Sequence, residues 1–486
     1  NRAYAVAEYG TTYPKNGWAE QSDYEWFEAL KKAIPECIKK AGIAADNIAA
    51  ITCDATTNTL VYLDENDTSV RPPILWMDVR ATEEASFIDT IREEYDATKF
   101  YKPGFRADTM VPKCMWVKKN EPENWAKTKT IMEFEDWLNW KLTGRKTVSM
   151  SVAAFRWNYD DKNGGYPVDF YNAVGLDDVV DKFPEPVLKV GEVVGNISAE
   201  AAEIFGLSKK TVVVEGTADC NACMFGVGGV RPNGMTLIGG TSTCLLGLSE
   251  EEFHVDGVNG TYPNCMYDGT SLLEGGQTAA GSILTWFKNN LLPAAWMQEA
   301  VNRNMNIYDL ITEKASEVPI GCDGLVMMDY FQGNRAPYAD SKARGMFWGL
   351  SIGTTPAHLA RAVYEGVAYG ANHCIVSMKK AGYDVKEIYA CGGLAQSDFW
   401  MQMHADIIGV PMYTTVCLGD CIIAAVGVGI YPNFWEAADS MIRVDKEYIP
   451  NMEAHKEYQF YMDRYMETWP QMREIVHKTV DHNNKK

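Results

Sequence analysis

Basic residues are scarce in this chain relative to acidic ones. Its 486 residues include 45 lysines and arginines against 65 aspartates and glutamates, which gives a formal net charge of −20. Such a charge repels phosphate backbones and anionic lipids, and it leaves no broad basic face for either partner. The sequence therefore predicts no nucleic-acid partner and no membrane partner, and it favours a small substrate that is neutral or escorted by a metal ion.

Long hydrophobic runs are also absent. No apolar stretch reaches the roughly 18 residues that a membrane-spanning helix needs, and the first ten residues lack a charged-then-apolar signal pattern. We therefore expect a soluble, cytoplasmic protein. A chain of 486 residues exceeds what one hydrophobic core usually organises, so we also expect two large lobes.

Soft metal ligands at paired spacing are few. The 12 cysteines are irregularly distributed, unlike the dense framework of a small secreted domain, so reduced thiols are expected. Cys220 and Cys223 form one Cys-x-x-Cys pair, but a zinc site needs two more ligands, and no second CxxC or HxxxH exists. The sequence therefore predicts no metal-ligating residues and no redox role for this pair.

Strand-like and helix-like segments alternate in both halves of the chain. Apolar residues at helical spacing predict helices over 356–381 and 398–409, and continuous apolar runs predict buried strands at 48–53 and 60–63. Such alternation is typical of α/β proteins. The stretch 226–235, rich in glycine, is predicted to be the crossover between the lobes.

Two glycine-rich turns have the composition of nucleotide-binding sites. LIGGTSTCLLG, residues 237–247, places small and hydroxyl residues between two strand-like runs, where backbone amides can hold a phosphate. Residues 389–412 contain a strand, a Gly392-Gly393 bend and a helix with Ser397 and Asp398 as cap candidates. The glycine pair lets a ring or ribose lie against the backbone. An ordinary hairpin and a close strand-to-helix packing point are the structural alternatives.

Asp219 is the candidate for acid–base chemistry. It follows the strand TVVVEG and a small-residue bend, and it opens the helical run 220–226. Because a helix N-terminus favours negative charge, we expect a depressed pKa for Asp219, which would hold it as the anion. It can accept a proton or act only as a helix cap, and the local sequence leaves both roles open.

Together these segments resemble the FGGY carbohydrate kinases, of the sugar-kinase, actin and Hsp70 superfamily. GMFWGLSIGTTPAHLARAVYE, residues 345–365, satisfies the family's second signature without a departure. IGGTSTCLLG resembles the family's phosphate hairpin, CGGLAQSDFWMQMHAD its adenosine motif and GTADCNACMFGVG the segment with its catalytic base. The first signature is looser, since DTMVPKCMWVKK has Met110 and Cys114 where the pattern prefers other residues.

The resemblance covers essentially the whole chain. It implies an α/β fold of two ribonuclease H-like (actin-like ATPase) domains with an interdomain cleft: a sugar-binding domain over 1–230 and an ATP-binding domain with C-terminal helices over 231–486. Members usually begin with a strand and an Asp-x-Gly-Thr phosphate turn, and this sequence starts after that place. We therefore expect the first strand and phosphate loop to be missing, and weak or no catalysis if the molecule lacks them. The family also suggests a homodimer.

The implied reaction is phosphoryl transfer from ATP, with Mg²⁺, to a primary hydroxyl of a ketopentose such as ribulose or xylulose. CDATTNT (53–59) and LLEGGQTAAGSILTWF (272–287) resemble the ribulokinase-like branch, whereas LWMDVRA (75–81) resembles a substrate loop of xylulokinase and glycerol kinase. Erythritol, glycerol or a deoxyketohexose remain alternative substrates. A catalytically inactive sugar-binding regulator and a chaperone-like or actin-like ATPase are the alternatives of another class.

The resemblance also implies roles for individual residues. Asp219 would take the proton of the attacking hydroxyl. The sugar would be contacted by Asp54, Thr56, Thr57, Trp76, Asp78 and Glu133. The phosphates would be held by Gly240, Thr241 and Ser242, and the adenosine would be framed by Gly281, Gly392, Gly393 and Ser397.

Overall fold

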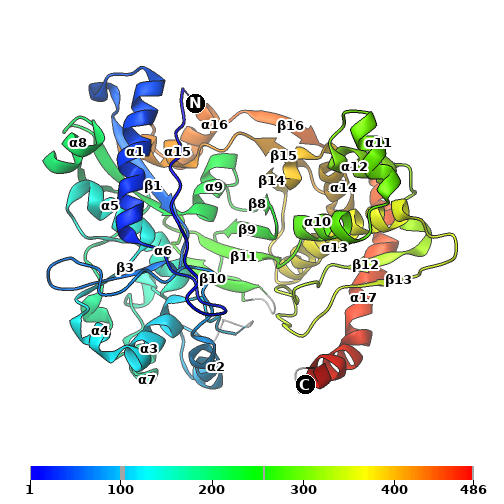
Figure 1. Cartoon of the computed structure of the whole chain (residues 1–486), viewed down its shortest axis with the longest axis horizontal. Helices are drawn as coiled ribbons and strands as arrows, with labels where there is room; N and C mark the ends of the chain where they lie inside the picture. The colour runs from blue at the N-terminus through cyan, green and yellow to red at the C-terminus, as the bar shows by residue number, and fades with distance from the viewer. Residues whose placement is uncertain (1, 99–103, 255–257, 484–486) are drawn as a thin grey trace.

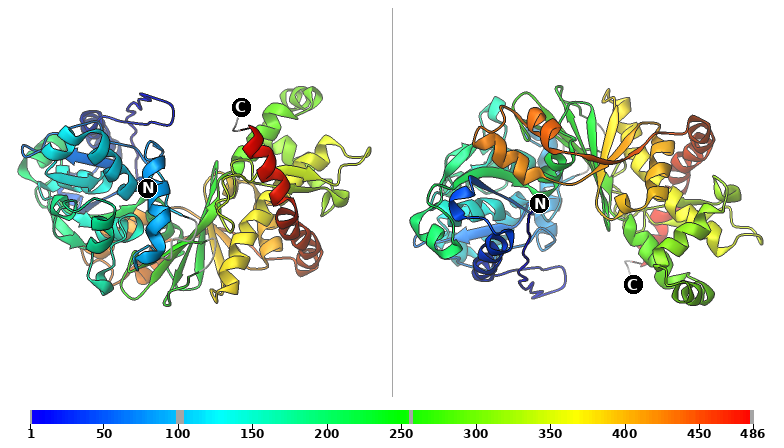
Figure 2. Two further views of the ribbon diagram at one scale, coloured as in Figure 1. Left: turned by 90° about the horizontal axis from the view of Figure 1, so that it is seen from below. Right: turned by 90° about the horizontal axis from the view of Figure 1, so that it is seen from above.

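Two lobes lie side by side, with the strands of one large sheet between them. The structure is a computed structural model that describes residues 2–98, 104–254 and 258–483. Figure 1 shows the N-terminal lobe mainly in blue and cyan, the C-terminal lobe in green to red, and the strands of the large sheet in green and, from late in the chain, in yellow to orange. Views from below and from above show the same division (Figure 2). None of the helices in the described ranges combines the length and the apolar character that a membrane span requires.

The N-terminal lobe contains a three-stranded sheet with the order β1-β7-β6. β1 (Ala50–Ala55) runs parallel to β7 (Val212–Ala218), and β6 (Val193–Asn196) is antiparallel to β7. Ala55 lies opposite Ala218, so the carboxyl ends of β1 and β7 are at the same edge of the sheet. Polar residues at these two strand ends are therefore brought together.

Helices and two small sheets surround this central sheet. The longest of these helices, α1, begins after the Ser22 cap and ends where Gly42 adopts a left-handed conformation (φ 64°). The elements of this part are α1 (Asp23–Ala41), β2 (Leu60–Leu63), α2 (Thr82–Ile91), α3 (Met110–Asn120), α4 (Pro122–Lys127), β3 (Thr130–Glu133), α5 (Phe134–Thr143), β4 (Val148–Ser149), α6 (Met150–Arg156), α7 (Val168–Ala173), β5 (Val187–Leu188) and α8 (Ala199–Phe205). β2 pairs with β3, and β4 with β5.

The C-terminal lobe is built on a seven-stranded sheet with the order β10-β11-β9-β8-β14-β15-β16. Its strands are β8 (Gly234–Gly239), β9 (Thr243–Ser249), β10 (Asn259–Pro263), β11 (Ser271–Gln277), β14 (Glu387–Cys391), β15 (Met412–Thr415) and β16 (Val444–Tyr448). β8 and β9 form an antiparallel hairpin, and β14 runs parallel to both β8 and β15. The hairpin turn and the end of β14 are therefore neighbours.

The helices of this lobe pack around the sheet and around a small ladder of β12 and β13. They include the two helices that the sequence predicts at 356–381 and 398–409, which are confirmed as α13 and α14. The bounds are α10 (Gly281–Asn290), α11 (Ala294–Asn302), α12 (Ile307–Ser316), β12 (Val326–Met328), β13 (Met346–Trp348), α13 (Pro356–Lys380), α14 (Asp398–Ile408) and α17 (Met452–Asn483).

The chain crosses between the lobes more than once. α9 (Asp219–Val227) leads from β7 to β8, next to the predicted crossover at 226–235. After β15 the chain returns, because α15 (Gly419–Gly427) and α16 (Phe434–Met441) bury Ile422 and Ala437 in one cluster with Val214 of β7. Two helices late in the chain thus belong to the core of the N-terminal lobe (Figure 1), which the order of elements along the sequence did not predict.

Candidate active site

A cavity of about 810 Å³ in the C-terminal lobe gathers the predicted nucleotide residues. Gly240, Thr241, Gly281, Gly393 and Ser397 line it, although they come from three distant parts of the chain. Its remaining walls include flat aromatic side chains suited to a nucleobase. These are Tyr308, Tyr364, Phe399 and Trp400. Shape and lining therefore match the size of a nucleotide.

The hairpin turn and the start of α10 are locked together by their backbones. The amide of Ala280 donates to Thr241 O (2.9 Å) and the amide of Gly281 donates to Gly240 O (3.0 Å). Across the turn, Gly240 donates to Ser242 O at 2.9 Å. The positive end of the α10 dipole therefore points at the hairpin, which is a suitable environment for an anionic phosphate.

Glycine is required at this junction. We expect Gly281→Ala to raise the KM for ATP about 5- to 150-fold, because a Cβ would lie 2.5 Å from Gly240 O and overpacking of this kind costs about 1–3 kcal/mol. Steady-state kinetics at varied ATP measure it. Gly353→Ala is the matched control, since its Cβ would meet Ser351 Oγ at 3.6 Å. An unchanged KM for the Gly281 variant would contradict the phosphate site.

Gly392 and Ser242 adjoin the cavity without lining it. Gly392 has φ 87°, and a Cβ there would lie 2.4 Å from Gly239 O, so glycine alone lets the end of β14 approach β8 this closely. Ser397 caps α14 by accepting a hydrogen bond from the Trp400 amide at 3.3 Å. The predicted cap is confirmed, and it orients the helix that forms one cavity wall.

A second cavity, of about 620 Å³, lies in the N-terminal lobe and contains Asp219. Asp54, Thr56 and Trp76 line it as well, so the structure brings these predicted sugar residues together with the predicted base. The parallel register of β1 and β7 places Asp54 beside the start of α9, which Asp219 opens. Trp76 is 46 % exposed, which leaves a ring face available for stacking on a sugar.

The electrostatic state of Asp219 differs from the prediction. Burial raises the pKa of Asp219, although the Cys220 amide, which donates to Oδ1 at 2.6 Å, and the charge of Arg156 both oppose that shift. The expected depressed pKa is therefore wrong, because loss of solvent outweighs the helix terminus. Burial and the nearby Asp219 charge also raise the pKa of Asp54. A carboxylate with a raised pKa is a better proton acceptor.

Three of the predicted sugar residues do not line this cavity. Asp78 is fully buried and accepts hydrogen bonds from the Ala19 amide (2.6 Å) and from Arg80. Glu133 is also fully buried and accepts from the Thr59 amide (3.0 Å) and from Trp157 Nε1 (2.8 Å). Thr57 Oγ1 accepts from Arg156 Nε at 3.2 Å. The first two orient the substrate loops rather than face the cavity.

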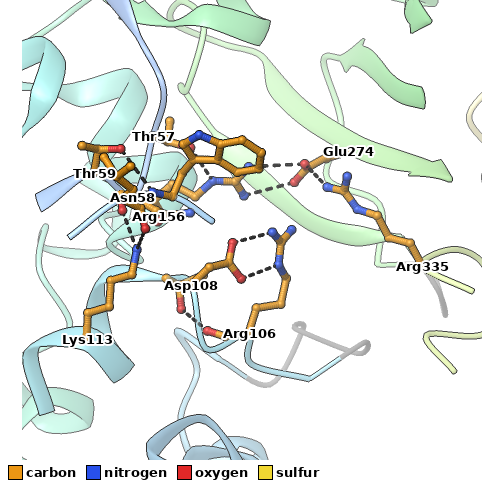
Figure 3. Close-up of polar contacts among 12 residues, drawn as sticks. Thr57, Asn58, Thr59, Arg106, Asp108, Lys113, Arg156, Glu274 and Arg335 are labelled. Carbon is orange, nitrogen blue, oxygen red and sulfur yellow. Dashed lines mark hydrogen bonds and ion pairs between the residues drawn. The ribbon is translucent and has the colours of Figure 1, made fainter. Parts of the chain in front are cut away.

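Reasoning from sequence missed an ion cluster that joins the lobes (Figure 3). Arg156 of α6 contacts the Glu274 carboxylate of β11 through both terminal nitrogens, at 3.1 and 3.3 Å, and Arg335 binds the same carboxylate. Burial alone would raise the pKa of Glu274, but the two arginines lower it to about 2. A carboxylate inside the apolar run LLEGG was the available signal, because buried charges need partners.

Further charged groups extend this cluster in the N-terminal lobe. Arg106 Nε donates to Asp108 Oδ1 at 2.9 Å, and Lys113 Nζ donates to the carbonyls of Asn58 (2.6 Å) and Leu75 (2.7 Å). Figure 3 shows Lys113, Asp108 and Arg106 below the loop that carries Thr57. Burial lowers the pKa of Lys113 to about 8. The loop beside the sugar-side cavity is therefore held by the buried ammonium of Lys113.

Among the described residues, Glu135, Asp136 and Glu215 are near enough to one another for a metal, with their ligand atoms within 4.8 Å. All three are buried, and Asn139 Nδ2 donates to both glutamates at 3.0 and 2.8 Å. Burial raises the pKa of Glu215 to about 8. A neutral carboxyl can act as a hydrogen-bond donor within such a buried group, so a structural role accounts for this cluster without a metal ion.

Models of two domains of one protein family match the chain. The N-terminal domain of the FGGY family of carbohydrate kinases matches residues 3–226, and the C-terminal domain matches residues 235–428. The chain is 30% identical over 446 residues to Ribulokinase 2 of Staphylococcus saprophyticus, covering 87% of this chain and 82% of that protein. It is 30% identical over 479 residues to a xylulose kinase of Staphylococcus epidermidis, covering 97% and 92%.

Solved structures show the same fold. A xylulose kinase from Rhodospirillum rubrum superposes with a TM-score of 0.84 at 24% identity, covering 96% of this chain and 93% of that one. A Plasmodium falciparum glycerol kinase with ADP superposes with a TM-score of 0.80 at 19% identity, covering 94% and 92%. The expected α/β fold with two actin-like ATPase domains is confirmed.

Proposed function

The chain belongs to the FGGY family of carbohydrate kinases, and we propose that it phosphorylates a primary hydroxyl of a ketopentose of the ribulose or xylulose type. It is a sugar kinase, a phosphotransferase with an alcohol group as acceptor. Sugar kinases of this family use ATP, generally with a divalent metal, so ATP and Mg²⁺ are the expected cofactors. The names of the relatives, ribulokinase and xylulose kinase, support the ketopentose class.

The position of Asp219 is the observation that carries the proposal. It lines the N-terminal cavity together with Asp54 and Trp76. It also opens α9, the helix that leads to β8 and so to the phosphate hairpin. A sugar in the N-terminal cavity would therefore present its hydroxyl to the carboxylate of Asp219, at the start of the helix that leads to the phosphate hairpin.

The nucleotide would be held by the C-terminal lobe. Phosphoryl transfer depends mainly on positioning and on neutralising charge, and little covalent help is needed. The hairpin at Gly240, Thr241 and Ser242 would bind phosphate oxygens, aided by the α10 dipole. Gly281, Gly392, Gly393 and Ser397 would frame the adenosine. The aromatic walls would bind its base by stacking.

The sugar would be oriented by the N-terminal lobe. Asp54, Thr56 and Trp76 would contact it directly, and Asp219 would accept the hydroxyl proton as the oxygen attacks. Thr57 and Arg156 lie next to these residues and supply further hydrogen-bonding groups. Asp78 and Glu133 act as positioning residues, since each holds a backbone amide of the neighbouring loops.

The residues at the sugar-side cavity also fit a divalent metal ion. Mg²⁺ prefers hard oxygen ligands and is usually bound through one or two carboxylates plus phosphates. Asp54 and Asp219 provide such carboxylates on one cavity. Bound there, Mg²⁺ would neutralise charge on the transferring phosphate.

A coupled assay of ADP release tests the proposal. We expect the purified protein to give its highest kcat/KM with ribulose or xylulose among a panel that adds rhamnulose, fuculose, erythritol and glycerol. A higher value with erythritol, glycerol or a deoxyketohexose would identify another substrate class. Sugar binding by calorimetry without ADP release from any compound would instead favour an inactive sugar-binding regulator. The expected homodimer and cytoplasmic location stay predictions.

A further inference from the structure

Three cysteines from separate segments of the chain lie in contact with one another. Cys223 lies in α9, Cys391 ends β14, and Cys417 lies between β15 and α15. The sulfurs of Cys223 and Cys391 are 3.0 Å apart, and those of Cys223 and Cys417 are 3.9 Å apart. Cys417 is exposed, whereas Cys223 and Cys391 are partly buried. The neighbour of Cys223 is therefore not Cys220, its partner in the sequence motif.

The cluster lies where two connections between the lobes touch each other. Leu418 N donates to Gly226 O at 3.3 Å, and Thr415 Oγ1 donates to Val227 O at 3.1 Å. A Cβ on Gly226 would lie 2.5 Å from Cys417 Sγ, so the backbone of α9 packs directly on the returning segment. A covalent bond formed here would act on both connections.

Cys223 and Cys391 are each close along the chain to a residue of the proposed active site. Asp219 precedes Cys223 by one helical turn, so the two side chains share a face of α9. Cys391 directly precedes Gly392 and Gly393, which are proposed to frame the adenosine. A link between Cys223 and Cys391 would therefore tie the helix of the base to the nucleotide turn.

We propose that Cys223, Cys391 and Cys417 form a thiol cluster that hydroperoxides oxidise to a Cys223–Cys391 disulfide, which slows phosphoryl transfer. Hydrogen peroxide transfers one oxygen to Cys417, which gives a sulfenic acid and one water. Cys223 then attacks this sulfur, so a Cys223–Cys417 disulfide forms and a second water leaves. Cys391 finally attacks Cys223, and Cys417 is released as a thiol.

The geometry explains why such a bond would reduce activity. A disulfide requires an S–S distance of about 2.05 Å, so the two sulfurs must approach by about 1 Å from their present separation. A displacement of about 1 Å at a reacting group can cost about 100-fold in rate. The shift acts on α9 one turn from Asp219. The expected loss of phosphoryl-transfer activity rests on the proposed function, whereas formation of the Cys223–Cys391 disulfide does not.

The thiols are expected to react slowly. Hydrogen bonding to Cys391, together with burial, raises the pKa of Cys223 to about 12, and the contact with Cys223 and burial raise the pKa of Cys417. Both groups are therefore protonated at neutral pH, and the thiolate is the species that attacks an oxidant. The cluster would respond to sustained oxidation and stay reduced otherwise.

The experiment compares reduced and peroxide-treated protein. Treated samples are blocked with N-ethylmaleimide and digested with trypsin and chymotrypsin, and mass spectrometry identifies the linked peptides. We expect a Cys223–Cys391 cross-link, a fall in kcat of at least about tenfold, and recovery of both with dithiothreitol. Cys223→Ser should keep its activity after treatment, whereas Cys391→Ser should accumulate the Cys223–Cys417 cross-link instead of the Cys223–Cys391 one.

Cys421→Ser is the matched control, because it is an exposed cysteine of the neighbouring helix α15 and should be inactivated like the unaltered protein. Absence of the cross-link in the unaltered protein overturns the proposal. Equal inactivation of Cys223→Ser overturns it too, as does a cross-linked enzyme with unchanged kcat. A reduced protein without kinase activity would contradict the proposed function. The proposal of a thiol cluster would then be tested only by whether the Cys223–Cys391 cross-link forms.

Discussion

Replacement of Asp219 by asparagine is expected to lower kcat by about 10²–10⁴-fold, the usual contribution of a general base. Asparagine keeps the size of the side chain and can still accept the Cys220 amide hydrogen bond that Asp219 accepts at 2.6 Å. Helix α9 should therefore be preserved. The dissociation constant for ATP should stay within a few-fold, because proton acceptance matters only in the transition state. The ADP-release assay gives kcat, and calorimetry gives ATP affinity.

The pH dependence provides a second check on the same residue. A base must be deprotonated to act, and burial raises the pKa of Asp219 above the ordinary value of 3.8. Activity should therefore be lost as the pH falls through the raised pKa, at a higher pH than an aspartate with the ordinary pKa would give. Asp268→Asn is the control, because Asp268 is 62% exposed in its surface pair with Lys189. Near-normal turnover of Asp219→Asn would refute the assignment.

The nucleotide-binding residues were predicted from short local motifs. The hairpin, the Gly392-Gly393 bend and the Ser397 cap are each written in a short contiguous stretch, and the fold places them on one cavity. Their chemistry depends on backbone geometry that glycine and a capping hydroxyl encode locally. Local sequence patterns can therefore predict such turns and caps, while the nucleotide-binding role of these residues stays a prediction.

The sugar side could be predicted only in part, because its contacts are distant in the chain. Arg156 and Glu274 are 118 residues apart, and no periodicity indicates that they meet. The sequence predicted that Asp78 contacts the sugar, but in the folded protein its carboxylate is buried and bonded to Arg80. The direction of the pKa shift of Asp219 also depended on burial, which tertiary packing alone determines.

Substitution of Glu274 by glutamine is expected to have the largest effect on stability. The carboxylate is 2% exposed and holds Arg156 from the other lobe and Arg335 from its own. Glutamine keeps the shape but removes the buried negative charge that Arg156 and Arg335 share, and breaking a buried ion pair costs about 3–5 kcal/mol. Urea unfolding followed by tryptophan fluorescence measures the loss. Asp439→Asn is the control, since its pair with Arg231 is exposed and should contribute at most about 1 kcal/mol.

The pH dependence of the unfolding free energy tests the same role of Glu274. The two arginines lower the pKa of Glu274 to about 2, from an ordinary value of about 4.3. A carboxylate with a depressed pKa contributes its full stabilisation above the ordinary value and loses it as the pH falls through the lowered one. The difference in unfolding free energy between the unaltered protein and Glu274→Gln should therefore persist at pH 5 and shrink steadily as the pH falls from about 4 towards about 2. A difference that is absent at pH 7, or constant down to pH 2, would show that Glu274 does not act as the charged link between the lobes.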